Sequence, residues 1–499
     1  MTDRRTARAR IAPALIALGL MAGPGLAQDP LSASDWLSGS IQSPPRETSG
    51  WRPGSGRPAD AQLPTPGAPP VAETGAVGKV AVTRLDEADP DSAGTQSARK
   101  AGLPPNLWAG SDPARLAQLI GQTPARLPVM NALLRRVLTA QLTPPATAGE
   151  TARGTLFLAR VDRLLGMGAN ADAARLLASA GLRSPESFRR LFDVALLAGE
   201  ETRACAVMND TPGIAPSFAA RIFCLAQSGD WSAAAITFHG AEALGLIPQD
   251  RLALLAQYLD DSYVDAGQPL EPPQPVTPLD FRMHEAVGQP LPTAPLPLAF
   301  AHSDLRPNSG WKARLEAAER LASAGVLPAA QLRDIYGEQK PAASGGVWER
   351  AAAEQRLEAA LNAGDSAALA AALPAAFAEF AGAGMGDVLA ALVAERLPED
   401  LSGKAGQIAS RLRQWQGLAT ADPVAIDPAL AGGEAAPLAT GPDRHGEALL
   451  SAMAQIDRGL DGDMAQAARG LAGLRALGLT AEADLAATQL TLAPELAAP

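Results

Sequence analysis

The chain has 499 residues, of which 47% are hydrophobic and only 4% aromatic, and its formal net charge is −11. At roughly 100–200 residues per domain, this length allows about two to four domains. The hydrophobic residues are mostly alanine and leucine, which favour helices because alanine loses no side-chain entropy there and leucine loses little. The composition argues against an all-β fold and against an enzyme with an aromatic core.

The first 27 residues have the three parts of a secretory signal peptide. Arginines between Arg4 and Arg10 form a basic start, Ile11 to Ala22 is apolar, and Gly25-Leu26-Ala27 supplies the small residues of a cleavage site. The apolar run is shorter than the ~20 residues of a membrane anchor. We therefore expect cleavage after Ala27 and a mature protein in the periplasm.

Cleavage changes the charge of the chain. It removes four arginines and one aspartate, which leaves 38 basic against 52 acidic side chains and a net charge of −14. Binding to nucleic acid needs clustered lysine and arginine that release counterions from phosphates. We therefore expect no nucleic-acid partner, and no later segment has the length and apolarity of a membrane span.

Residues 28–111 are rich in proline and glycine, with twelve prolines between residues 28 and 105. Such a composition is typical of a mostly disordered or extended arm. Within it, residues 77–85 alternate apolar and polar side chains like a short strand. This segment either docks on the protein or a partner, or is an apolar linker.

Apolar residues then recur at spacings of three and four, the pattern of amphipathic helices. We expect an all-α fold of antiparallel helical hairpins stacked as an irregular α-solenoid. In the second block, helices are expected at 312–324, 329–336, 347–363 and 367–380. The expected order is a helical-repeat block (112–268), a proline-rich linker (269–310), a second helical block (311–418), a linker (419–445) and a C-terminal hairpin with a tail (446–499).

A turn signature recurs in the first block. Gly168, Gly199 and Gly229 each precede small residues five and six positions later; Gly462 repeats the pattern, and Gly364 is a partial copy. A period near 30 residues with glycine between helices indicates stacked helical hairpins. Glycine permits the left-handed conformation at a helix end, and an acidic residue such as Asp230 suits the start of the next helix.

Residues 229–241 carry a family resemblance. Gly229-Asp230-Trp231-Ser232-Ala233-Ala234, followed by Phe238 and Ala241, resembles the second helix of a tetratricopeptide repeat, and Pro248 lies near the end of such a unit. The resemblance covers about a fifth of the chain and is best over one unit. It implies a helical superhelix whose concave face binds peptides or protein partners. A generic helical stack without a groove is the alternative.

The two cysteines, Cys205 and Cys224, lie on consecutive expected helices. An oxidising compartment favours their pairing. We expect a structural disulfide, because a redox pair is more often closely spaced.

No pattern of residues points to catalysis, a metal or a cofactor. The four histidines are far apart and lack ligand spacing. Glu186-Ser187 resembles the acid of lytic transglycosylases, but no matching downstream motif follows, and Ser184-Pro185-Glu186 has the form of a helix start. We expect no catalytic, metal-binding or cofactor-binding residues.

Trp231, Trp311 and Trp348 are candidate contacts for a partner. Trp311 and Trp348 each follow a glycine-containing loop at a helix start. Such aromatic residues either fix a hairpin to its neighbour or form an interaction hot spot.

These observations predict an exported, non-enzymatic helical-repeat scaffold or adaptor that binds protein partners in a bacterial envelope. Its oligomeric state stays open. One alternative is an accessory component of an envelope machine such as the flagellar motor. Two others are a peptidoglycan-acting hydrolase and a ligand carrier with a tryptophan-lined pocket.

Overall fold

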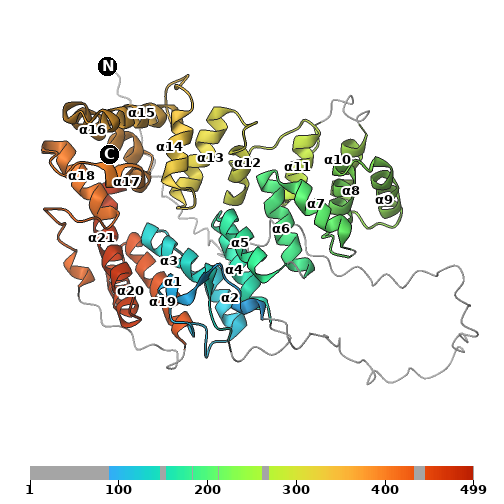
Figure 1. Cartoon of the computed structure of the whole chain (residues 1–499), viewed down its shortest axis with the longest axis horizontal. Helices are drawn as coiled ribbons and strands as arrows, with labels where there is room; N and C mark the ends of the chain where they lie inside the picture. The colour runs from blue at the N-terminus through green and yellow to red at the C-terminus, as the bar shows by residue number, and fades with distance from the viewer. Residues whose placement is uncertain are drawn as a thin grey trace, which may run out of the picture. The chain divides into compact units, whose positions relative to one another are not determined.

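The computed structural model describes residues 89–145, 153–181, 184–211, 213–260, 269–431 and 444–497. They form 21 α-helices, short 3-10 turns and one pair of two-residue strands (Figure 1). The expected all-α fold is confirmed. The signal peptide, the strand-like segment 77–85 and the linker residues 432–443 lie outside the described residues. None of the described helices is both long and apolar enough to cross a bilayer.

The folded part begins by residue 89, earlier than the boundary expected at 112. It opens with η2 (Pro90–Ser92), β1 (Gln96–Ser97) and α1 (Ala98–Ala101). β1 pairs in parallel with β2 (Ala140–Gln141), and Trp108 is fully buried. The expected arm is therefore too long at its C-terminal end, because prolines here start a helical turn or lie in loops of the folded protein.

Proline also begins the next two helices, α2 (Pro113–Gln122) and α3 (Pro128–Thr139). Its fixed φ suits the first helical position, where no amide donor is needed. The Asp112 carboxylate accepts a hydrogen bond from the Arg115 amide at 2.8 Å and so caps α2.

Arg160, on α4 (Thr155–Gly166), is fully buried and joins the N-terminal segment to the helices. Its guanidinium donates to the carbonyl oxygens of Leu138 and Ala140, both at 2.8 Å, and of Asp91 at 3.1 Å. Burial lowers the pKa of Arg160 to about 10. The guanidinium thus binds backbone groups of η2, α3 and β2 and holds these three elements together.

Asp91 is also fully buried and completes this arrangement. Its carboxylate accepts from the amides of Phe157 and Gly154 at 2.7 and 3.1 Å. Burial raises the pKa of Asp91, although these backbone donors and Arg160 oppose the shift. Asp91 therefore anchors η2 to the start of α4.

From α4 onward, each helix packs against its neighbour in sequence as far as α11. Such nearest-neighbour packing is typical of helical repeats. The helices of this run are α5 (Asn170–Ala180), α6 (Pro185–Ala198), α7 (Glu201–Asp210), α8 (Phe218–Gln227), α9 (Trp231–Ala243), α10 (Gln249–Leu259) and α11 (Pro278–Ala286).

The helix-start interpretation of Ser184-Pro185-Glu186 is confirmed. The Ser184 hydroxyl accepts from the Ser187 amide at 3.1 Å, and Pro185 is the first residue of α6. Glu186 pairs with Arg190, one turn along the helix, at 3.0 Å. The local role of this segment is to begin a helix.

The segment expected as a linker, 269–310, is folded into the protein. It contains α11, η5 (Leu298–Phe300) and α12 (Ala301–Asp304). The buried rings of Phe281 and Phe300 meet edge to face at 5.5 Å. Thr277 and Asp280 form a capping box at the start of α11, and Pro278 takes the first helical position. The prolines here set helix starts and turns, so they do not mark a linker.

The second helical block contains the four expected helices, with ends within two residues of prediction. They are α13 (Trp311–Ser323), α14 (Ala329–Gly337), α15 (Val347–Ala363) and α16 (Ser366–Gly382). They are followed by α17 (Gly386–Val393), η6 (Ala394–Arg396) and α18 (Gly403–Trp415).

The C-terminal segment contains a third helix in addition to the expected hairpin, and it packs against other parts of the chain. After η7 (Pro428–Leu430) it forms α19 (His445–Asp457), η8 (Arg458–Asp461), α20 (Met464–Ala476) and α21 (Thr480–Ala497). α19 packs against α2, and α21 against α3 and α18 (Figure 1). In a simple solenoid each repeat contacts only its neighbours, so these long-range contacts are an addition to the expected pattern.

Arg126, between α2 and α3, forms the polar part of this contact. Its Nε lies 2.7 Å from an Asp457 carboxylate oxygen, and its Nη2 lies 2.9 Å from Asp461. The Arg126 amide also donates to Asp457 at 3.0 Å. Nearby, the Gly446 amide donates to the Leu107 carbonyl oxygen at 2.8 Å. The start and end of the described chain are thus joined by charged and backbone contacts.

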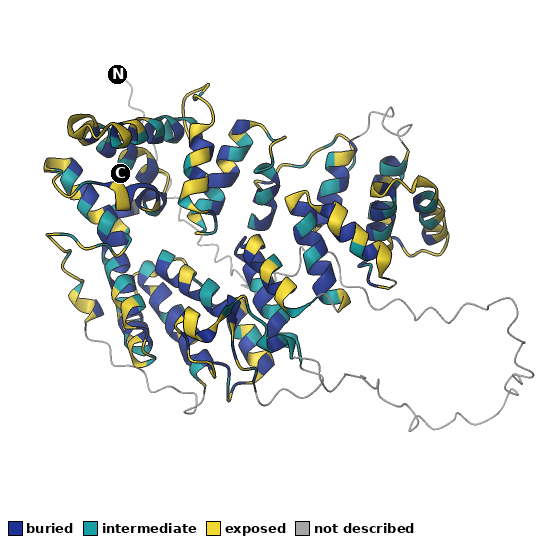
Figure 2. Ribbon diagram, in the orientation of Figure 1, coloured by how far each residue is buried: buried dark blue, intermediate teal, exposed yellow. Residues whose placement is uncertain are grey.

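The described residues contain two apolar cores. Figure 2 shows buried residues along the helices. The larger core includes residues from α1–α5 and from α13–α21. The smaller core is built mainly by α6–α11 and includes Phe188, Phe223 and Phe238. The first helical block is therefore shared between two cores.

Candidate functional site

Exposed apolar side chains gather around one helix, α9. Of the six large hydrophobic side chains that are exposed in the described residues, five lie between residues 218 and 246, and the sixth is Ile426. Trp231, Ile236, Leu244 and Leu246 have exposed fractions of 51%, 75%, 73% and 44%. We define the α9 surface as Trp231, Ser232, Ile236, His239, Gly240, Ala243, Leu244 and Leu246.

The local sequence explains how α9 is held. Gly229 adopts a φ of 85°, and the Asp230 carboxylate then accepts from the Ala233 amide at 3.0 Å. Ala234, Phe238 and Ala241 are buried. These are positions on which the tetratricopeptide resemblance depends, and they form the inward side of the helix.

The outward side of α9 is also largely uncharged. The helix contains no lysine or arginine and one carboxylate, Glu242, which lies 3.6 Å from the exposed His239 ring. A helix that is apolar on all sides is normally buried. Exposed apolar patches with polar surroundings mark interaction surfaces. α9 therefore has the side chains of an interface helix.

Gly240 is a second unusual feature of the α9 surface. It lies inside the helix, where glycine costs about 0.5–1 kcal/mol relative to alanine. A Cβ atom at this position would meet no atom within 4 Å. Packing among the described residues therefore does not require glycine at this position.

The three candidate tryptophans have different environments. Trp231 is half-exposed, and its ring centroid lies 6.2 Å from that of Tyr258. Trp311 is buried and donates from Nε1 to the Ile335 carbonyl oxygen at 2.8 Å. Trp348 is partly buried, 5.2 Å from the Trp311 ring. Trp311 and Trp348 thus join helices within the chain, which leaves Trp231 as the exposed candidate.

The expected repeat turns all have left-handed backbone conformations. The φ angles are 74° at Gly168, 75° at Gly199, 85° at Gly229, 62° at Gly364 and 91° at Gly462. A side chain with a Cβ is strained in this region. Glycine at these positions therefore allows each turn to close without backbone strain.

Cys205 and Cys224 are bonded to each other, with a sulfur–sulfur distance of 2.00 Å. Cys205 belongs to α7 and Cys224 to α8, and both are buried in the smaller core. The bond therefore fixes the pair of helices that precedes α9.

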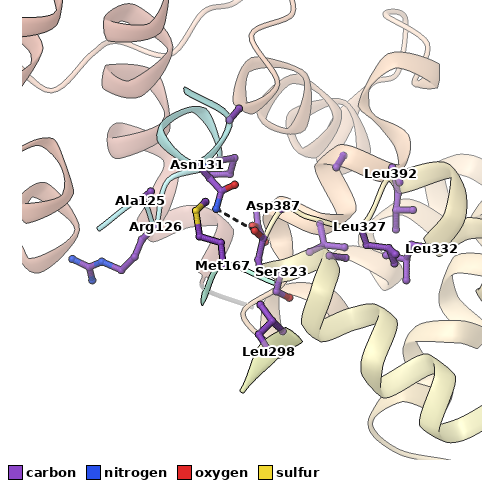
Figure 3. A pocket seen from close by; sticks show the side chains of 18 of the residues that line it. Ala125, Arg126, Asn131, Met167, Leu298, Ser323, Leu327, Leu332, Asp387 and Leu392 are labelled. Carbon is purple, nitrogen blue, oxygen red and sulfur yellow. Dashed lines mark hydrogen bonds between the residues drawn. The ribbon is translucent and has the colours of Figure 1, made fainter. Parts of the chain in front are cut away.

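A cavity of about 620 Å³ lies between α3 and α4 on one side and α13, α14 and α17 on the other. Figure 3 shows Asn131, Ser323 and Asp387 near its middle and Leu327, Leu332 and Leu392 along one side. The Asn131 amide donates to the Ala324 carbonyl oxygen at 3.1 Å. Volumes of this size are typical of small-molecule sites.

The lining of the cavity differs from that of the expected alternatives. Asp387 is the one carboxylate among the described lining residues, and none of them is a tryptophan. Burial raises the pKa of Asp387 to about 6. A hydrolase that acts through a pair of carboxyl groups would need a second acid beside it. The cavity therefore presents neither a carboxylate pair nor a tryptophan-lined pocket.

Glu354, on α15, is a second carboxyl group with a strongly shifted pKa, outside the cavity. Its exposed fraction is 2%. Burial, with a smaller contribution from Glu358, raises its pKa to about 7. Glu358 itself binds Arg396 and has a lowered pKa. No group of three or more potential metal ligands occurs in the described parts of the chain.

Replacing Glu354 by glutamine is expected to stabilise the protein at pH 8 by up to about 3 kcal/mol and to have little effect at pH 4. The folded-state pKa is above the unfolded value of 4.5, so the carboxyl group contributes stability at low pH. That contribution is lost as the pH rises through about 7. Urea unfolding followed by circular dichroism between these pH values measures the effect.

The control is Glu316→Gln, which alters a half-exposed carboxylate on α13. This variant should follow the wild type at every pH. Parallel pH profiles for the wild type and Glu354→Gln would contradict the assignment of a raised pKa to Glu354.

No family model, no curated protein and no solved structure matches the chain.

Proposed function

We propose that the chain is an exported, non-enzymatic helical scaffold that binds a protein partner in a bacterial envelope through the α9 surface. The observation that carries this proposal is the cluster of exposed apolar side chains on an almost uncharged helix. Large apolar groups in contact with water favour association because burying them releases their hydration water.

The sequence supports the location and the mode of action. The signal-peptide pattern of residues 1–27 and the cysteine pair suit an exported protein. The tetratricopeptide resemblance coincides with α9, and helical-repeat proteins commonly act by binding other proteins. The α-solenoid remains our proposed arrangement for the repeats in α4–α11.

The test places a photo-crosslinking amino acid at Ser232 in the full chain, expressed in its native cells. We expect a discrete, stoichiometric adduct in the envelope fraction. Ile236→Glu should remove this adduct, because it places a charge at the centre of the α9 surface and an unpaired charge resists burial. Cleavage of the signal peptide is checked by the mass of the recovered chain, which should begin at Gln28.

Ile426→Glu is the matched control, since Ile426 is an exposed isoleucine away from α9 with an exposed fraction of 39%. It should leave the adduct unchanged. A diffuse ladder of adducts that is insensitive to Ile236→Glu would contradict the proposal. Digestion of peptidoglycan by the purified chain, abolished by one carboxylate substitution, would instead establish an enzyme.

A further inference from the structure

Resting on the proposed function, we infer that the occupant of the α9 surface is the α9 surface of a second copy of this chain, packed antiparallel about a two-fold axis. Two-fold dimers place the same patch of both copies in contact, so the patch must be complementary to itself. The order of large and small side chains along α9 meets this requirement.

The complementarity follows from helix geometry. At about 100° per residue, Ser232, Ile236, His239, Gly240 and Ala243 form one outward stripe. If two such helices lie antiparallel with their midpoint between residues 237 and 238, Ile236 of each copy faces Gly240 and His239 of the other. Gly240 has open space where its Cβ would be, so it can receive the isoleucine.

The ends of the stripe fit in the same register. Ser232 of one copy faces Ala243 of the other, and these small side chains allow the helices to approach closely. Trp231 and Leu244 lie on opposite sides of this stripe, roughly 100° of helix rotation from its centre, so they flank the contact. Both residues are exposed in the single chain, with exposed fractions of 51% and 73%.

Charge also favours a second copy at this face. The chain is acidic, with a net charge of −11, so two copies repel each other across most of their surfaces. The α9 surface contains no lysine, arginine or carboxylate side chain. The stripe itself therefore brings no like charges together, whereas a strongly basic or acidic partner would find no complementary charge on it.

The available area predicts a weak dimer. From their exposed fractions, the large side chains of the α9 surface present on the order of 400–500 Å² per copy. Even if all of this area were covered, two copies would bury at most about 1,000 Å², the lower limit for a specific interface. Association should therefore appear at micromolar or higher concentrations and strengthen with salt, which screens the repulsion between acidic chains.

Analytical ultracentrifugation of the mature full chain over a range of concentrations tests this inference. We expect a reversible monomer–dimer equilibrium. Ile236→Glu should weaken the dimer at least tenfold, whereas Ile426→Glu should leave it unchanged. Gly240→Ala should weaken the dimer several-fold while raising the thermal midpoint by about 1 °C.

Gly121 provides the matched glycine control. It lies near the end of α2, is exposed, and has no atom within 4 Å of a built Cβ. Gly121→Ala should also raise the thermal midpoint, but it should not change the dimer. Only the inferred interface predicts opposite effects on stability and association at Gly240.

Engineered cysteines test the orientation. A chain carrying both Ser232→Cys and Ala243→Cys should form a disulfide-linked dimer on a non-reducing gel. Either single substitution should not, because the two copies of one residue lie about 16 Å apart in an antiparallel pair. Efficient crosslinking of the single variants would overturn the antiparallel register.

Three outcomes would overturn the second copy as occupant. One is a dimer that persists in Ile236→Glu. Another is a monomeric wild type whose thermal midpoint falls with Ile236→Glu, which would indicate that a segment of the same chain covers α9. The third is a monomeric wild type that still gives the Ser232 adduct with a different envelope protein. That result leaves the proposed function intact, because the α9 surface would still bind a protein partner, whereas the absence of every Ser232 adduct, the dimer included, would contradict the proposed function as well.

Discussion

Replacing Arg160 by leucine is expected to lower the free energy of unfolding by about 3–5 kcal/mol, because each buried hydrogen-bond acceptor left without a donor costs about 1–3 kcal/mol. The variant leaves the carbonyl oxygens of Asp91, Leu138 and Ala140 without their donor. It also leaves the buried Asp91 carboxylate without the nearby positive charge of Arg160. Urea unfolding followed by circular dichroism measures the loss.

Hydrogen exchange gives a local measurement of the same change. The Thr95 amide donates to the Thr139 carbonyl oxygen at 2.8 Å, beside the strands that Arg160 holds. Exchange at Thr95 should become faster in Arg160→Leu. The control is Arg175→Leu, which removes an arginine whose side chain is 63% exposed and should change stability little. Equal effects of the two substitutions would contradict the anchoring role of Arg160.

Breaking the Cys205–Cys224 bond is expected to destabilise the protein by about 3 kcal/mol on the chain-entropy model of a closed loop. The two residues are separated by 19 positions, and the bond joins α7 to α8. The double variant Cys205→Ser and Cys224→Ser should show this loss in thermal unfolding. Because both positions are buried, the new hydroxyl groups add to the cost.

Adding a reductant distinguishes the effect of losing the disulfide from the effect of the serine side chains. Dithiothreitol should lower the thermal midpoint of the wild type and leave that of the double variant unchanged. Since α8 packs against α9, the loss should also weaken dimerisation through the α9 surface. Two free thiols in unreduced wild type would contradict the disulfide.

Local sequence patterns predicted the helices where each helix has its own start and stop signals. Both ends of the helix Val347–Ala363 were predicted correctly, because Gly345 and Gly346 precede it and Gly364 follows it. Gly364 adopts a left-handed φ of 62° that ends the helix. The disulfide was predictable for a different reason: the chain has only two cysteines, so each has a single possible partner within it.

Composition predicted the boundaries of the folded segments poorly, because proline occurs both at helix starts and in linkers. Pro90 and Pro278 begin helical turns that pack into the protein, yet the same residues contribute to a composition typical of linkers. The contact between the buried rings of Phe281 and Phe300 shows that residues 269–310 belong to the folded protein, and that contact depends on tertiary structure. The boundaries of the arm and of the first linker were therefore wrong.

The candidate site was only partly predictable. The uncharged sequence of α9 was a usable signal, because polar residues normally cover the outer side of a helix. Which tryptophan stays exposed was not predictable, since Trp311 is buried by its contact with Ile335 and Trp348. The cavity could not be predicted either, because its lining residues come from positions 124 to 416.

The contact of Arg126 with Asp457 joins residues 331 positions apart in the sequence. On a ribosome that adds about 5–20 residues per second, the first helices therefore wait on the order of 15–70 s before their C-terminal packing partners have been synthesised. The N-terminal helices cannot complete their native packing while the chain is still being made. Final packing of the N-terminal helices is thus a step that follows synthesis of the C-terminal helices.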